Sequence, residues 1–361
     1  MRRTYLAPLT LKIYISLTVI FFLSACAGVE FGGASPTLKI GLVAPFEGLH
    51  RPLGYEALFA VKLALQERNL SGGINGYRVE LVALNDFDDP AEAQTQARVL
   101  LADPDVLGVV GHLSSATTLA ALPIYQEAGL ALSVPWTIEA VESHLNRKGV
   151  VSVAANYDET SFWLDTISQE QGFNTIVNVA DINLSSVPAN IQALELTSEA
   201  VTAGEDILTL RRADVSLPLF GQVDVGSPQV VQVAKAAANG LIFVSPGPDP
   251  RDVPGTDAFV EAYQTLAGFS PGPRAVLAYD ATNVLLDAIE QAMLACPQAM
   301  LGRQAMLEQP TRTEISAIIN QIQRPGISGD IAFDAQGQRL DAPVWVYQIS
   351  GEEYPGALIA P

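Results

Sequence analysis

Cysteine and histidine are scarce in this chain, which has two cysteines and three histidines in 361 residues. The histidines, His50, His112 and His144, lie far apart, and none has metal-ligand spacing to another histidine or to a cysteine. The chain also lacks a P-loop and a G-x-G-x-x-G segment that follows a strand. These absences argue against an enzyme, and we expect no catalytic residue, no metal and no cofactor.

Basic residues are also few, with 20 lysines and arginines against 39 acidic residues and a formal net charge of −19. A strongly acidic surface repels phosphate backbones, so nucleic acid is not an expected partner. The hydrophobic fraction of 49% and the charged fraction of 16% are typical of large buried sheets. Beyond the first residues, no apolar run reaches the ~20 residues of a membrane span.

The N-terminal region has the pattern of an export signal with a lipid-modification site. Arg2 and Arg3 precede an apolar run at 13–22, which ends in the sequence Leu-Ser-Ala-Cys at 23–26. The apolar run is shorter than a membrane span, which favours a cleaved leader over a membrane helix. We predict a lipoprotein signal peptide at residues 1–25.

Cleavage would make Cys26 the new N-terminus and the site of lipidation, so the protein is expected to be extracytoplasmic and held to the membrane only by its acyl chains. Residues 26–36 are rich in Gly, Ala and Ser, which is typical of a flexible tether. Because Cys26 carries lipid, Cys296 has no partner and no disulfide is expected. Loss of the leader removes three basic residues and changes the charge from −19 to −22.

Strand and helix patterns alternate after the tether. Buried-strand patterns occur first at 38–44, 78–84, 106–111 and 130–134, and helical patterns at 55–68, from 90 onward and at 116–128. The acids Asp88 and Asp89 before Pro90 are interpreted as helix caps. This alternation is typical of a parallel sheet with helices on both faces.

A second series of elements begins after residue 156, and the stretch at 181–228 is less regular. Helices are expected at 162–171, 229–238, 257–266 and 276–294, and strands at 175–180, 240–244, 331–333 and 343–349. The roughly 336 residues that remain after the leader exceed one simple core, so we predict two α/β lobes.

Six segments, taken together and in order, resemble the type I periplasmic binding proteins of the branched-chain amino-acid receptor group. They are LKIGLVAPFEG at 38–48, SGGINGYRVELV at 71–82, NDFDDPAEAQTQARVLL at 85–101, VLGVVGHLSSATTLAALPIYQEAGL at 106–130, AVLAYDATNVLLDAI at 275–289 and GISGDIAFDAQGQR at 326–339. The resemblance implies two Rossmann-like lobes joined by three crossovers, with a ligand cleft between them that closes by hinge motion.

By this resemblance, lobe one comprises 37–154 plus 274–325, and lobe two comprises 155–273 plus 326–361. Lobe two looks shortened, because 181–186 runs almost directly into 188–194 where the family has about one further βα unit of some thirty residues. The shortened lobe is either a compact natural variant or a degenerate copy.

The first candidate site segment follows the strand at 106–111. Ser114, Ser115 and Ala116 lie where a strand ends and a helix begins, so hydroxyls and free amides there can hold a carboxylate. The resemblance assigns the carboxylate contact to Ser115, whereas its alternative role is a simple helix cap. His112, beside this segment, is interpreted as a structural imidazole.

A second segment, Pro135, Trp136 and Thr137, ends the next strand. Thr137 matches the family threonine that contacts the ligand's head group. Trp136 departs from the small residue usually found there, and it either narrows the pocket, stacks on an apolar or aromatic ligand, or belongs to the core.

The ligand's ammonium group needs a carboxylate from lobe two, and Asp224 is the candidate, one position later than the family's acid. Leu53 stands where the family has a pocket tyrosine. Tyr157, at the crossover into lobe two, and Arg274, before a crossover helix, are further candidate ligand-binding residues.

The resemblance implies a substrate-binding lipoprotein that captures an amino acid or related small ligand for an ABC permease and ATPase complex. A receptor that presents its closed form to a membrane sensor is the alternative, because one fold serves both uses. An enzyme is a distant third reading.

Overall fold

The computed structural model describes residues 36–137, 148–184, 186–295 and 309–360. The predicted signal peptide, Cys26, Cys296 and His144 lie outside the described residues. No helix in these described ranges is long and apolar enough to cross a membrane.

The first sheet contains five parallel strands in the order β2-β1-β3-β4-β5. Their bounds are Thr37–Ala44 for β1, Arg78–Asn85 for β2, Val106–Gly111 for β3, Ala131–Val134 for β4 and Val150–Ser152 for β5. Strands β3 and β4 are buried at every position, which explains their almost wholly apolar sequences. The four strands predicted in this region are confirmed, and β5 was not predicted.

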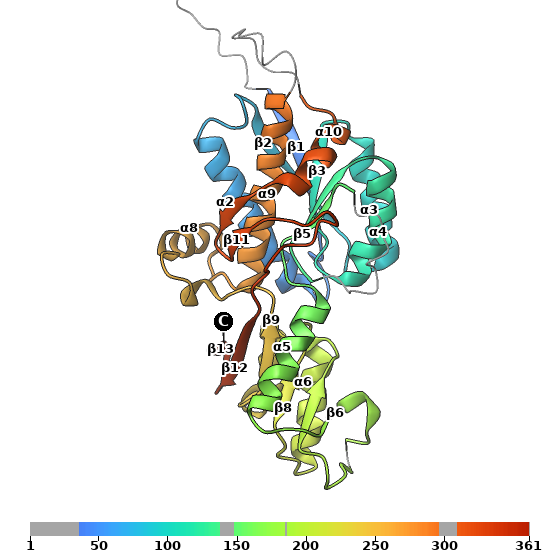
Figure 1. The fold of residues 1–361 in the computed structure, drawn as a ribbon, viewed down its shortest axis with the longest axis vertical. Coiled ribbons are helices and arrows are strands. Elements are labelled where there is room, and N and C mark those ends of the chain that lie inside the picture. The colour runs from blue at the N-terminus through green and yellow to red at the C-terminus, as the bar shows by residue number, and fades with distance from the viewer. Residues whose placement is uncertain (1–35, 138–147, 185, 296–308, 361) are drawn as a thin grey trace, which may run out of the picture. The chain divides into compact units, whose positions relative to one another are not determined.

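Helices cover both faces of this sheet, as neighbouring residues of β1 demonstrate. Leu42 belongs to the core formed with α2, α8, α9 and α10, whereas Val43 belongs to the core formed with α3 and α4. Figure 1 shows α2 and α9 beside each other and α3 with α4 elsewhere on the sheet. The helices span Arg51–Leu70 (α2), Pro90–Ala102 (α3), Ser115–Glu127 (α4), Asp257–Ala267 (α8), Pro273–Ala295 (α9) and Arg312–Ile318 (α10).

The second sheet has six strands in the order β13-β12-β9-β8-β7-β6. Strands β6 to β9 run parallel to one another, β12 runs antiparallel to β9, and β13 runs antiparallel to β12. Helix α5 packs on one face and α6 and α7 pack on the other. The bounds are Ile176–Asn178 (β6), Ala193–Leu196 (β7), Leu219–Gly221 (β8), Ile242–Ser245 (β9), Trp345–Ser350 (β12), Glu353–Ala360 (β13), Tyr157–Glu170 (α5), Ala200–Arg212 (α6) and Pro228–Ala234 (α7).

The two sheets with their helices are the two lobes, called the first and the second lobe below. The predicted α/β fold with two lobes is therefore confirmed. The residue boundaries given above for the lobes stay a prediction. Helix α8 bears on these boundaries. The prediction placed it in lobe two, but its residues Phe259 and Tyr263 pack in the core of the first sheet.

The connection between β6 and β7 has no α-helix among its described residues. These strands pair in parallel, yet the described residues at 179–192 contain only a single 3-10 turn, η2 (Val179–Asp181), and no α-helix. Parallel neighbours are usually joined by a crossover that contains a helix. The shortening of lobe two stays a prediction, and this connection without a helix is the place in the structure to which it refers.

The stretch at 181–228, described above as irregular, in fact holds β7, α6 and β8. The two strands have four and three residues, which is too short to produce a clear alternation. Helix α6 was recognisable, because Ala203, Ile207 and Leu210 face inward at helical spacing.

Candidate functional site

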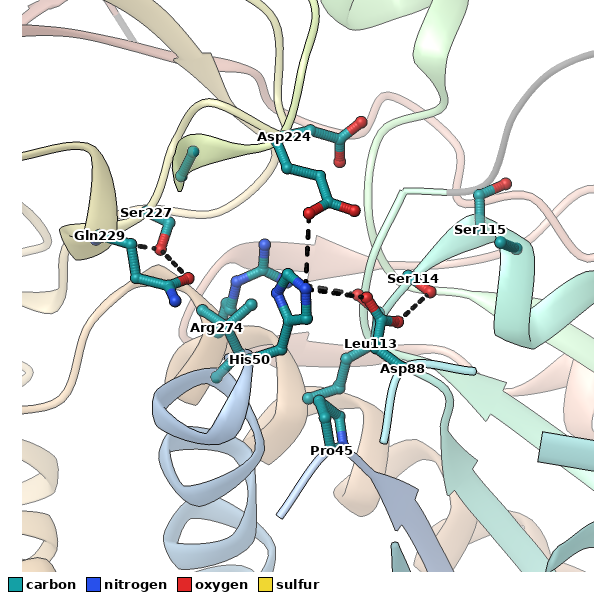
Figure 2. A pocket seen from close by; sticks show the side chains of 14 residues that line it. Pro45, His50, Asp88, Leu113, Ser114, Ser115, Asp224, Ser227, Gln229 and Arg274 are labelled. Atoms are coloured by element: carbon teal, nitrogen blue, oxygen red, sulfur yellow. Dashed lines mark hydrogen bonds and ion pairs between the residues drawn. The ribbon is translucent and has the colours of Figure 1, made fainter. Parts of the chain in front are cut away.

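A pocket of about 220 Å³ lies where parallel strands of both sheets end. Loops after β1, β2 and β3 form one wall, and loops after β7 and β8 form the other, as expected for ligand sites of open parallel sheets. Figure 2 shows side chains from both walls directed into this space. The lining residues are Pro45, His50, Leu53, Asp88, Leu113, Ser114, Ser115, Ala116, Glu199, Ala200, Asp224, Ser227, Gln229 and Arg274.

The loop after β3 presents the start of α4 to the pocket. Ser114, not Ser115, is the N-cap, and its Oγ accepts a long hydrogen bond of 3.4 Å from the Thr117 amide. The same hydroxyl donates to Asp88 Oδ1 at 2.6 Å. Ser115 and Ala116 lie in the first turn of α4, at the positive end of the helix dipole, and both line the pocket. This wall can therefore receive an anion.

The acids Asp88 and Asp89 have different roles, which corrects the interpretation of both as caps. Asp89 is the N-cap of α3, and its carboxylate accepts hydrogen bonds from the amides of Ala91 and Glu92. Asp88 has a positive φ of 60° and instead directs its carboxylate into the pocket.

His50 lies between acids of the two lobes. Its Nε2 is 3.7 Å from Asp88 Oδ2 and 3.4 Å from Glu199 Oε2, as Figure 2 shows for Asp88. The ligand atoms of these three residues all lie within 4.8 Å of one another, so together they could hold a metal ion. Their positions in three separate segments explain why sequence spacing gave no sign of this group.

The second lobe supplies the opposite wall through the loop after β8. Val223 is buried in the core, whereas the next residue, Asp224, lines the pocket. Gln229, near the start of α7, is 5% exposed and donates from Nε2 to the carbonyl oxygen of Leu49 in the first lobe at 2.6 Å. This hydrogen bond and the His50–Glu199 contact join the two walls.

Arg274, near the start of α9, is a cation that the first lobe contributes to the pocket. It is only 7% exposed, and its guanidinium carbon lies 3.5 Å from the ring centre of Trp136. Its Nη1 donates to the carbonyl oxygen of Leu113 at 3.4 Å, which is long for a hydrogen bond. Burial lowers the pKa of Arg274, and the nearby charges of Glu56 and Asp224 oppose that shift.

Glu56 of α2 fixes the backbone around Arg274. Its Oε1 accepts hydrogen bonds from the amides of Gly272 at 3.1 Å and Ala275 at 3.0 Å, and so caps α9 from outside the helix. The carboxyl group is buried, and loss of hydration raises its pKa, while the hydrogen bonds from Ala275 and the charge of Arg274 oppose the rise.

Five of the nine predicted ligand-binding residues line the pocket: Ser114, Ser115, Ala116, Asp224 and Arg274. Pro135, Trp136, Thr137 and Tyr157 do not line it. Trp136 and Thr137 are 3% and 5% exposed, and neither Trp136 Nε1 nor Thr137 Oγ1 has a hydrogen-bond partner in the described part of the chain. The structure places Trp136 in the core of the first lobe, behind Arg274.

His112 is a structural imidazole, as interpreted from the sequence. The ring is fully buried, with Nδ1 2.7 Å from Asp86 Oδ2 and Nε2 3.2 Å from the Tyr125 hydroxyl. Burial raises the pKa of that tyrosine above its usual range. None of these three residues lines the pocket.

Two α/β lobes with a polar pocket between their strand ends define a solute-binding protein. The chain belongs to the periplasmic binding protein family, whose model matches residues 37–193 and 189–353. The two matched stretches meet at 189–193, within the connection before β7. The family predicted by resemblance is thus confirmed.

Known relatives match this chain over nearly its whole length and nearly their own. The Leu/Ile/Val-binding protein homolog 2 of Brucella abortus (strain 2308) is 25% identical over 90% of this chain and 93% of its own. The solved branched-chain amino acid transporter substrate binding protein of Streptococcus pneumoniae, in complex with isoleucine, has a TM-score of 0.74 at 19% identity and covers 90% of this chain and 100% of its own. A solute binding protein from R. palustris in complex with benzoate has a TM-score of 0.70 at 17% identity. The match covers 90% of this chain and 95% of the R. palustris chain.

Proposed function

We propose that this protein captures one amino acid or related zwitterion in the pocket between its lobes and delivers it to an ABC importer. The observation that carries the proposal is the pairing of two unlike walls. The first turn of α4, with Ser115 and Ala116, offers amides for a carboxylate, and Asp224 and Glu199 on the opposite wall offer carboxylates for an ammonium group.

The comparisons support this assignment. The family consists of binding proteins, and relatives that match almost the whole chain carry names or bound ligands of the branched-chain amino-acid type. Binding between two walls also suits capture, because each wall contributes contacts only when the lobes are closed. Binding without catalysis is therefore the proposed activity.

The proposed location is the outer face of the cell membrane, with acylated Cys26 as the anchor. The support is the sequence at 23–26 after an apolar run, together with a family name that implies an extracytoplasmic site. Labelling cells with a radioactive fatty acid tests it, since label should enter the wild type and be absent from Cys26→Ser. Label in both proteins would refute anchoring through this residue.

The binding proposal is tested by thermal shift of the full chain in detergent against the common amino acids and their analogues. A ligand at about 100 times its Kd adds about 2.7 kcal/mol to the folded state and raises the melting temperature. The double variant Ser115→Ala, Asp224→Asn should lose most of this shift because it changes both walls. Binding is refuted if no compound shifts the wild type, and the pocket is refuted if the double variant responds equally.

A further inference from the structure

Arg274 is buried, yet its guanidinium is only partly satisfied, by a long hydrogen bond to the carbonyl oxygen of Leu113 and by the ring of Trp136. The side chain is 7% exposed, and its Nε has no hydrogen-bond acceptor among the described residues. Within the same described ranges, no carboxylate oxygen forms an ion pair with the guanidinium. Burial of a cation without a paired anion is costly, so such a group normally has a function that uses its charge.

The surroundings hold this guanidinium in one place. The indole of Trp136 stacks on one face at 3.5 Å, and Glu56 fixes the backbone on both sides of Arg274 through the amides of Gly272 and Ala275. A planar guanidinium that is already ordered loses little entropy when it binds a carboxylate in its plane. The arrangement is therefore suited to binding an anion, not to filling space.

The pocket shows where that anion would lie. Arg274 lines it together with Ser115 and Ala116 in the first turn of α4, so a cation and the positive end of a helix both face the pocket from the first lobe. The acids Asp224 and Glu199 come from the other lobe. A ligand with its negative end toward Arg274 and its positive end toward these acids satisfies both walls.

We propose that Arg274 receives the anionic end of the ligand, and that the pocket therefore selects carboxylates over the matching neutral amides. This rests on the proposed function and assigns the charge discrimination of the same site to one residue. Thr137 does not take this part, because its side chain is buried and does not line the pocket. Trp136 is a positioning residue that acts through Arg274.

The test compares acid and amide pairs, which differ only at the proposed contact. The pairs are leucine and leucinamide, phenylalanine and phenylalaninamide, and benzoate and benzamide, titrated calorimetrically into the full chain in detergent. The wild type should prefer the acid in each pair it binds. Arg274→Met should weaken acid binding by roughly 10- to 150-fold, the value of a hydrogen bond to a charged group, with little change for the amide. Arg274→Lys should recover part of the acid preference through its charge.

The acid-to-amide ratio separates this role from a general loss of stability, which would weaken both members of a pair alike. Arg98→Met, an exposed change on α3, is the control and should leave the ratio unchanged. If Arg274→Met does not fold, Arg274→Lys carries the test through the same ratio. An unchanged ratio in the Arg274 variants, or a wild type that binds amides as well as acids, overturns this inference alone. A wild type that binds no amino acid refutes the proposed function itself.

Discussion

Gln229 of the second lobe donates a hydrogen bond of 2.6 Å to the carbonyl oxygen of Leu49 in the first lobe. The amide group of Gln229 is buried and is also oriented by Ser227, whose Oγ lies 3.3 Å from Oε1. Both side chains line the pocket. The bond therefore joins the two walls at the place where a ligand is expected.

The first prediction concerns this bond between the lobes. Gln229→Leu should weaken ligand affinity by about 2- to 12-fold, because a neutral hydrogen bond contributes ~0.5–1.5 kcal/mol to the closed form. Calorimetric Kd values for the amino acid found in the screen measure the effect. Gln232→Leu, on the exposed side of the same helix, is the control. Equal affinities in the two variants would show that the bond does not support closure.

The second prediction concerns Trp136, for which the sequence left a pocket role and a core role open. Because the indole is 3% exposed and packed in the core of the first lobe, Trp136→Ala should reduce the free energy of unfolding by roughly 3–5 kcal/mol. Phe162→Ala, at an aromatic residue that is 67% exposed, should cost less than about 0.5 kcal/mol. Urea denaturation without ligand measures both. Trp136→Ala with wild-type stability but weaker binding would favour the pocket role instead.

The third prediction follows from the raised pKa of Glu56, whose ordinary value is 4.5. The carboxyl group of Glu56 keeps its proton to a higher pH in the folded state than in the unfolded state. Its contribution to the free energy of unfolding therefore decreases as pH rises. The contribution of Glu56 to the free energy of unfolding should be fully present below about pH 4.5, the ordinary pKa, and should be lost as pH rises through the raised pKa of the folded state. Asp280, also buried with a raised pKa, acts in the same direction.

Glu56→Gln should remove part of that fall, since the amide cannot ionise but its oxygen can still accept hydrogen bonds from the amides of Gly272 and Ala275. Urea denaturation from pH 4 to pH 8 at constant ionic strength measures the slope. Glu261→Gln, an exposed change on α8, is the matched control. A slope for Glu56→Gln identical to that of the control would contradict a raised pKa for the buried carboxyl of Glu56.

Local sequence patterns predicted the parts of the fold and site that depend on one segment. The buried run of β3 followed by Ser114 and Ser115 defines a strand end and a helix start, and both are found there. Asp224 was located by the family resemblance and not by a strand pattern, because β8, with three residues, was too short to be recognised.

Features that depend on several segments could not be predicted in this way. His50, Glu199 and Gln229 meet at the pocket because loops after β1, β7 and β8 converge, and no spacing within the chain records that convergence. The direction of a side chain after a strand end is equally open, because a loop residue no longer follows the alternation of the strand. For this reason Thr137 was predicted as a ligand contact and Trp136 was left between a pocket role and a core role, and the structure shows both buried and outside the pocket lining.

The fourth prediction concerns Arg339, which is 2% exposed and links two connections between the lobes. Its guanidinium donates to the carbonyl oxygens of Val153 at 3.0 Å, of Ser328 at 3.0 Å and of Asp330 at 2.8 Å. Its Nη1 also donates to Ser328 Oγ, which in turn donates to the buried carboxylate of Asp280 on α9. A single planar cation thus satisfies acceptors from several segments.

Arg339→Lys keeps the charge but should reduce the free energy of unfolding by about 3 kcal/mol or more. One ammonium group cannot reach carbonyl oxygens that are arranged around a planar fork, so buried acceptors lose their partners. Arg212→Lys, at the exposed end of α6, is the control and should change stability by less than about 0.5 kcal/mol. If Arg339→Lys cost no more than this control in urea denaturation, charge alone and not the directed hydrogen bonds would account for the role of Arg339 between the lobes.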